Sequence, residues 1–149
     1  MLRYLQVLKD KPIQILETSA ALTRGACVAK DYATGKVAGA TATGGFFLVD
    51  NAMNFDGINA VIAPSEGDFE SIASGALCLM VPTFVGERYA TSELTIGSLE
   101  VGDALKASAG KFVAGASSDV CEWVYGGTYA DPTGITMYIV ERVAPITVA

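Results

Sequence analysis

Two stretches of this chain are copies of one another, and their turn residues restrict the fold more than any other feature. Residues 99–117 read LEVGDALKASAGKFVAGAS, and residues 22–41 read LTRGACVAKDYATGKVAGAT. In each copy a Leu precedes a Gly by three residues, and a polar turn with a Gly-Lys pair leads into the run VAGA. Glycine readily adopts the positive φ that tight turns require, and β-branched residues suit a pleated sheet. Each copy is therefore predicted to form a β-hairpin.

Short apolar segments separated by turn residues continue along the rest of the chain. The run FFLVD at 46–50 predicts a central buried strand, because its apolar character is continuous. Residues 65–75 fit either a short helix or an acidic loop, and residues 126–134 predict a turn-rich loop. Pro145 is expected to end the last strand. Further strands are expected at 13–18, 58–63, 76–81, 84–89, 93–96, 121–125 and 135–143.

This spacing of strands and turns predicts the fold class. Short strands at intervals of about eight to twelve residues are typical of all-β sandwiches and barrels. We therefore predict one β-rich domain over residues 1–149, a compact sandwich or barrel of short antiparallel strands. Its two related hairpins would be arranged pseudo-symmetrically. With 51% hydrophobic residues, a chain of 149 residues can bury a core, although many of these residues are Ala.

The charge of the chain is acidic overall and unevenly distributed. Of the net charge of −6, residues 1–50 carry six Lys and Arg against four Asp and Glu, and residues 51–149 carry four against twelve. Nucleic-acid binding is not expected, because it requires clusters of cations that displace counterions from phosphates. The asymmetry has two interpretations: an acidic, solvated surface, or a basic N-terminal third that meets an acidic partner surface.

Residue types that carry catalysis or bind metals are scarce. The chain contains no His, which excludes a Ser-His-Asp or Cys-His site and makes a zinc site unexpected. Three widely spaced cysteines, Cys27, Cys78 and Cys121, predict buried reduced thiols rather than disulfides. No signal peptide or membrane-spanning run is apparent. We expect no catalytic residue, no metal, no cofactor and no membrane contact.

Several motifs resemble fragments of known sites. Residues 50–57 resemble a calcium loop, but Ala52 and Ala63 occupy positions where that loop needs acids, so a plain turn is favoured. The Gly-Lys pairs lack the GxxxxGK[ST] pattern of a phosphate loop, which favours solvated turn lysines. Asp68 and Glu70 would share a face as a paired acid site or carry ordinary loop charges. The aromatic residues Trp123, Tyr125 and Tyr129 would line a sugar-binding face or belong to a core or interface cluster.

The N-terminal residues 1–11 mix apolar and basic side chains. Such a segment is either a terminal arm that binds a partner or a first strand docked on its own sheet. Under the first interpretation, Arg3, Tyr4, Leu5 and Leu8 are the candidate partner-binding residues.

The two hairpin copies and the closing run ITMYIVERV resemble the small β-rich decoration, or cement, proteins that coat the heads of tailed bacteriophages. The scarcity of His and the abundance of Ala and Gly are similar in that group. The resemblance implies a structural virion protein that binds the outside of an icosahedral capsid, commonly as a homotrimer. It would stabilise the capsid by bridging subunits of the major capsid protein. It also implies synthesis in the bacterial host cytoplasm and residence on the capsid surface.

Other functions remain open from the residues alone. A tail-tube or fibre component would share the β-rich composition. A small trimeric β-barrel enzyme would need polar residues that converge between subunits, and a carbohydrate-binding module would use Trp123 and the neighbouring tyrosines.

Overall fold

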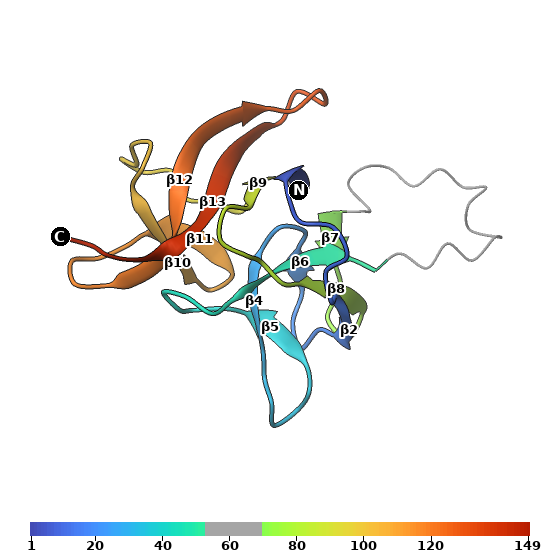
Figure 1. Ribbon diagram of the computed structural model, residues 1–149. Helices are drawn as coiled ribbons and strands as arrows, with labels where there is room; N and C mark the ends of the chain where they lie inside the picture. The colour runs from blue at the N-terminus through green and yellow to red at the C-terminus, as the bar shows by residue number, and fades with distance from the viewer. Residues whose placement is uncertain (53–69) are drawn as a thin grey trace.

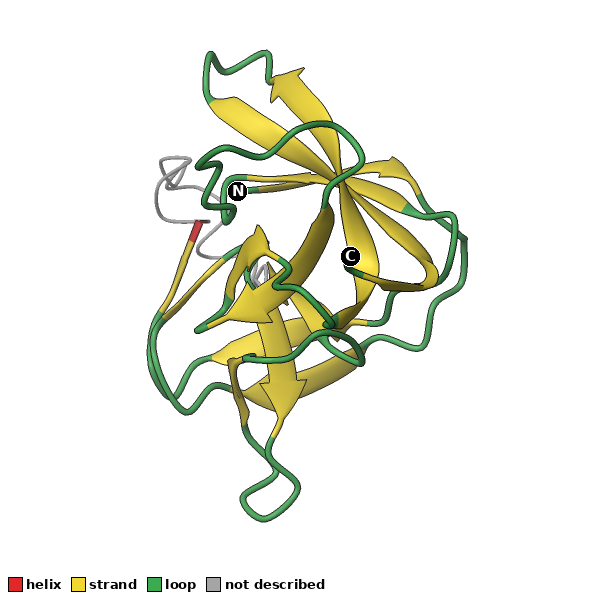
Figure 2. Cartoon of the chain, turned by 90° about the vertical axis from the view of Figure 1, so that its left-hand side faces the viewer, coloured by secondary structure: helices red, strands yellow, loops and turns green. Residues whose placement is uncertain are grey.

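A computed structural model describes residues 1–52 and 70–149 (Figure 1). The protein is all-β, as the sequence predicts, and its strands form antiparallel sheets (Figure 2). The strands of the described residues are β1 (Leu2–Gln6), β2 (Gln14–Glu17), β3 (Leu22–Thr23), β4 (Cys27–Lys30), β5 (Val37–Gly39), β6 (Phe47–Asn51), β7 (Ser71–Ile72), β8 (Leu77–Val81), β9 (Arg88–Thr91), β10 (Ala104–Ser108), β11 (Lys111–Ala114), β12 (Val120–Ala130) and β13 (Thr136–Thr147).

Two larger sheets pack against each other, and a two-stranded ribbon of β3 and β7 accompanies them. One sheet has six strands in the order β1-β9-β13-β12-β10-β11, and the other has five in the order β2-β8-β6-β4-β5. The five-stranded sheet curls until its ends approach, because Thr18, directly after β2, forms a parallel bridge with Val37 of β5. The result combines features of the predicted sandwich and barrel.

The repeat in the sequence is a repeat in the structure. Both predicted hairpins form, as β4–β5 and β10–β11. The turn before each hairpin closes in the same way, since Gly25 N–H donates to the Val49 carbonyl and Gly102 N–H donates to the Tyr125 carbonyl, both at 2.8 Å. The strand order β5-β4-β6-β8 of one sheet therefore corresponds to β11-β10-β12-β13 of the other. The fold contains one four-stranded unit twice.

The two hairpins also join the sheets. Gly110 N–H donates to the Ala40 carbonyl at 2.9 Å, and the Gly110 carbonyl accepts from Cys27 N–H at 2.8 Å. Ala42 and Ala107 exchange two further backbone hydrogen bonds of 3.1 and 2.8 Å. Small residues at these positions allow the backbones to approach closely.

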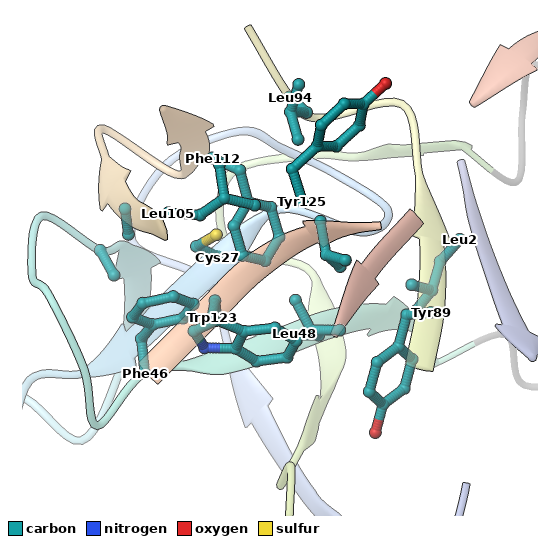
Figure 3. Close-up of a cluster of buried hydrophobic side chains, with 13 residues drawn as sticks. Leu2, Cys27, Phe46, Leu48, Tyr89, Leu94, Leu105, Phe112, Trp123 and Tyr125 are labelled. Atoms are coloured by element: carbon teal, nitrogen blue, oxygen red, sulfur yellow. The ribbon is translucent and has the colours of Figure 1, made fainter. Parts of the chain in front are cut away.

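A cluster of aromatic side chains fills the core between the sheets (Figure 3). Trp123 is fully buried, with the Phe46 ring stacked on it at 5.6 Å and the Phe112 ring edge-on at 5.3 Å. Offset-stacked and edge-to-face pairs are favourable arrangements of aromatic rings. A second cluster, which includes Val28, Val49 and Met80, is buried on the other face of the five-stranded sheet. Both faces of that sheet are therefore covered, as its continuous apolar run at 46–50 predicts.

Several strand boundaries differ from the sequence predictions. The strand expected at 84–89 begins only at Arg88, and of the segment 93–96 only Leu94 forms an isolated bridge. The loop expected at 126–134 is confirmed only at 131–134, because β12 continues to Ala130 through a bulge at Gly126–Gly127. Pro145 does not end β13, because an irregularity in its pairing with β12 accommodates the proline. The strand expected at 58–63 lies outside the described residues, as do residues 65–69 of the segment 65–75, whose described part contains β7 and a turn.

Candidate interaction surface

The N-terminal segment is a docked strand rather than a free arm. β1 pairs with β9 and forms one edge of the six-stranded sheet. Met1 and Leu2 are buried, with exposed fractions of 3% and 0%. The terminal ammonium donates to the Arg24 carbonyl at 2.8 Å and forms an ion pair with Glu70. Of the two interpretations of this segment, the structure supports the docked strand.

Two of the four candidate residues make internal contacts. Arg3 forms a bidentate ion pair with Asp131, with N–O distances of 2.7 and 3.2 Å, and lowers the pKa of that carboxyl. The Tyr4 hydroxyl donates to the Asp50 carboxylate at 2.7 Å, and its ring meets Tyr89 edge-on. Burial, assisted by Asp50, raises the pKa of Tyr4. Arg3 and Tyr4 therefore fasten β1 to the rest of the protein.

The other two candidates face solvent. Leu5 is the extra residue of a β-bulge, since Tyr4 pairs with Tyr89 and Gln6 pairs with Arg88. A bulge redirects the side chain of the extra residue, and Leu5 is 36% exposed. Leu8 follows β1 and is 58% exposed. These two leucines are the part of the sequence-derived site that remains available to a partner.

A buried ion pair holds the segment after β1 in place. The Lys11 ammonium binds Glu87 at 2.6 Å and also contacts the Tyr89 hydroxyl and the Pro82 carbonyl. Glu87 further accepts the backbone N–H groups of Leu8 and Phe84, each at 2.8 Å. Burial alone would raise the pKa of Glu87, but these hydrogen bonds lower it below its usual value. Residues 8–11 are thereby fixed against the turn before β9.

An apolar groove lies beside this ion pair. Residues 6–8 line one wall and residues 85–87 line the other, around a volume of about 390 Å³. We call the exposed side chains around it the N-terminal apolar surface; they are Leu5, Val7, Leu8, Phe84 and Val85. Val7, Leu8 and Val85 line the groove, and Leu5 and Phe84 lie close to them in the chain. Exposed apolar patches often mark binding sites.

Phe84 and Val85 were not among the sequence-derived candidates. They were expected in a strand, where alternate side chains would be buried. Instead they lie in a turn closed by the Glu87 N–H, which donates to the Phe84 carbonyl at 3.1 Å. Pro82 and Gly86, which flank Phe84 and Val85, are the sequence features that indicate this turn.

Part of the charge asymmetry along the chain is neutralised within the fold. Most cations of residues 1–50 form ion pairs with carboxylates of the same chain, several from the acidic remainder. The ion pairs are Arg3–Asp131, Lys11–Glu87, Arg24–Asp50, Arg24–Glu70 and Lys36–Glu17. Asp131, Glu87 and Glu70 of the acidic remainder thus neutralise cations of the N-terminal third within the same chain.

Other sequence-derived candidates have structural roles in the described residues. Trp123 and Tyr125 share the buried face of β12, as their spacing predicts, and belong to the core. This burial excludes Trp123 from a sugar-binding face. Glu70 pairs with Arg24 and the terminal ammonium, whereas Asp68 lies outside the described residues. Lys36 pairs with Glu17 in a turn.

The three cysteines are free and buried, as predicted. Burial raises the pKa of the Cys78 thiol to about 11. Within residues 1–52 and 70–149, no group of His, Cys, Asp and Glu side chains is arranged to hold a metal ion. The same residues contain no helix long and apolar enough to cross a membrane.

Comparisons with protein-family models, with curated proteins and with solved structures find no match for this chain.

Proposed function

We propose that this protein is a structural component of a bacteriophage virion that binds the outer surface of the icosahedral capsid. There it would bridge neighbouring subunits of the major capsid protein and stabilise the shell. The observation that carries the proposal is the N-terminal apolar surface, which is exposed at a sheet edge yet held rigidly by the Lys11–Glu87 ion pair. A fixed apolar surface binds at low entropic cost, because few side chains and no backbone must be ordered.

The proposed mode of action is repeated weak binding. A capsid presents the same contact many times, and a protein that holds two or more subunits gains from effective concentration. A homotrimer, implied by the sequence resemblance, would supply several such contacts at once. Sedimentation equilibrium of the pure protein would measure this assembly as three times the 15.5 kDa chain.

Gradient sedimentation of a lysate of the native source tests the proposed function. We expect the chain to migrate with DNA-filled heads, at a copy number comparable to that of the major capsid protein. Migration with isolated tails would favour a tail-tube or fibre protein instead. Complete absence from particles would overturn both virion functions and favour an enzymatic or ligand-binding role.

A double substitution tests the surface itself. Leu5→Ser with Leu8→Ser removes apolar area without touching Arg3 or Tyr4, and we expect at least tenfold weaker capsid binding with an unchanged fold. The matched control is Val101→Ser with Val120→Ser, because these valines are 74% and 49% exposed and lie outside the N-terminal apolar surface. Equal binding by the Leu5/Leu8 variant and the wild type would exclude this surface as the contact with the capsid. Deleting residues 1–10 is a poorer test, because Leu2 is part of the core.

A further inference from the structure

The two copies of the repeated hairpin differ most in their loops. In the second copy, β10 and β11 are joined by Ala109 and Gly110 alone, both with positive φ, 48° and 84°. Two-residue turns of this kind match the twist of antiparallel strands. In the first copy, six residues, 31–36, join β4 and β5. The second copy shows that a two-residue turn is enough to connect the two strands, so the six-residue loop of the first copy is longer than the hairpin requires.

The longer loop nevertheless has a defined shape. The Asp31 carboxylate accepts hydrogen bonds from the Ala33 N–H at 2.9 Å and the Thr34 hydroxyl at 2.7 Å. The Asp31 N–H donates to the Lys36 carbonyl, and the Gly35 N–H donates to the Asp31 carbonyl, both at 2.8 Å. The hydrogen bonds from Thr34 and Ala33 lower the pKa of Asp31. The loop is therefore pre-organised by its own polar groups.

This loop presents the most exposed large hydrophobic side chain of the described residues. Tyr32 is 87% exposed, and the hairpin that carries it extends away from the body of the protein (Figures 1 and 2). The Lys30 ammonium lies 5.6 Å from the centre of the Tyr32 ring, a cation–π contact, and forms no ion pair with a described residue. The Tyr32 ring and the Lys30 ammonium thus lie together at the tip of the β4–β5 hairpin, and the ring is not part of the core.

We infer that the tip of the β4–β5 hairpin is a second contact site, at which Tyr32 inserts into an apolar pocket of the capsid protein. Tyrosine is enriched among residues that dominate binding energy, because it brings a large contact area with few rotatable bonds. Charge complementarity would place a carboxylate at the rim of this pocket, where it would pair with the Lys30 ammonium and accept a hydrogen bond from the Tyr32 hydroxyl. A protein partner fits better than nucleic acid, because the net charge of −6 opposes phosphate binding. This inference rests on the proposed function for the identity of the partner.

Co-sedimentation with capsids that lack this protein tests the inference. Labelled wild-type protein is compared with Tyr32→Ala, Tyr32→Phe and Lys30→Met, and Val101→Ala is the control at another exposed apolar site. We expect Tyr32→Ala to bind at least tenfold more weakly and Tyr32→Phe to lose threefold or less, because the ring remains. Lys30→Met should weaken binding at low salt and reduce its salt dependence. Val101→Ala should bind like the wild type.

The results separate the two proposals. If the wild type fails to bind capsids, the proposed function is wrong, and so is this choice of partner. If the wild type binds and Tyr32→Ala binds equally well, the hairpin contact alone is overturned. Circular dichroism and thermal unfolding of each variant show whether the fold is intact, which is expected because Tyr32 contributes nothing to the core.

Discussion

At the scale of single residues, Lys11 and Glu87 have the largest consequences. Both side chains are buried, with exposed fractions of 5% and 3%, and each has several polar partners. Removing one member of a buried ion pair leaves the other uncompensated and costs about 3–5 kcal/mol. We therefore expect Lys11→Met to lower the free energy of unfolding by about this amount, measured by urea denaturation.

The matched control is Lys9→Met, because Lys9 is exposed and forms no ion pair with a described residue. It should change the free energy of unfolding by less than about 0.5 kcal/mol. The double variant Lys11→Met with Glu87→Leu should recover part of the loss, because no unpaired charge remains. A Lys11→Met protein as stable as Lys9→Met would show that the ion pair does not hold the N-terminal segment.

Thiol reactivity is a second prediction at this scale. Only the thiolate reacts quickly, and burial raises the pKa of Cys78 to about 11 and that of Cys27 well above its usual value. At pH 8 we expect no labelling of the native protein by a thiol-specific disulfide reagent within minutes. In guanidinium chloride all three cysteines should react. Rapid labelling of any cysteine in the native state would contradict the burial described for these side chains.

At the scale of elements, the repeated unit provides a matched pair of substitutions. Gly25 and Gly102 occupy equivalent turns and have similar φ, 92° and 100°. A Cβ at Gly25 would lie 2.6 Å from both the Met1 carbonyl oxygen and the Thr91 hydroxyl, whereas a Cβ at Gly102 would meet nothing within 4 Å. Gly102→Ala therefore carries only the strain of a positive φ, roughly 1–2 kcal/mol.

Gly25→Ala should lower the free energy of unfolding by the same amount and by about 1–3 kcal/mol more, because the new Cβ must displace β1. Chemical denaturation of both variants measures the difference, and thermal unfolding gives a second estimate. Equal destabilisation of the two variants would mean that β1 does not pack tightly on the turn before β4. The comparison needs no other control, because each glycine serves as the control for the other.

The sequence predicts elements well where a local signal decides them. The hairpin turns, the central strand β6 and the shared buried face of Trp123 and Tyr125 follow from turn residues and alternation. The matching VAGA letters mislead slightly, because Gly39 and Ala114, rather than Gly39 and Gly115, occupy equivalent pairing positions. In the second copy Phe112 stands between the Gly-Lys pair and VAGA, which shifts these letters by one residue.

Where pairing partners decide the structure, the sequence is insufficient. Pro145 and Gly127 look like strand breakers, but irregular pairing between β12 and β13 accommodates both. Within the candidate site, the exposure of Leu5 depends on a bulge against β9, and the engagement of Arg3 depends on Asp131, far along the chain. The apolar pattern of residues 1–11 predicts a surface. Only the fold shows that Arg3 and Tyr4 bind other residues of the protein whereas Leu5 and Leu8 face solvent.

At the scale of the whole molecule, electrostatics link the N-terminal segment to the acidic remainder of the chain. Hydrogen bonds and ion pairs lower the pKa of Glu87 and of Asp131 in the folded protein. In the unfolded chain these groups return to ordinary values, about 4.3 for Glu and 3.9 for Asp. The unfolded state therefore binds protons more readily than the folded state as the pH falls.

This difference predicts loss of stability in acid. The contribution of both carboxylates is fully present above about pH 5 and declines as the pH falls towards their lower folded pKa values. We expect the urea midpoint to be similar at pH 7 and pH 5 and clearly lower at pH 3. Glu87→Gln should start from a lower midpoint and lose less between pH 5 and pH 3, because one of the responsible groups is missing. A midpoint that stays constant to pH 3 would mean that the ion pairs of Lys11 and Arg3 contribute little to holding the N-terminal segment.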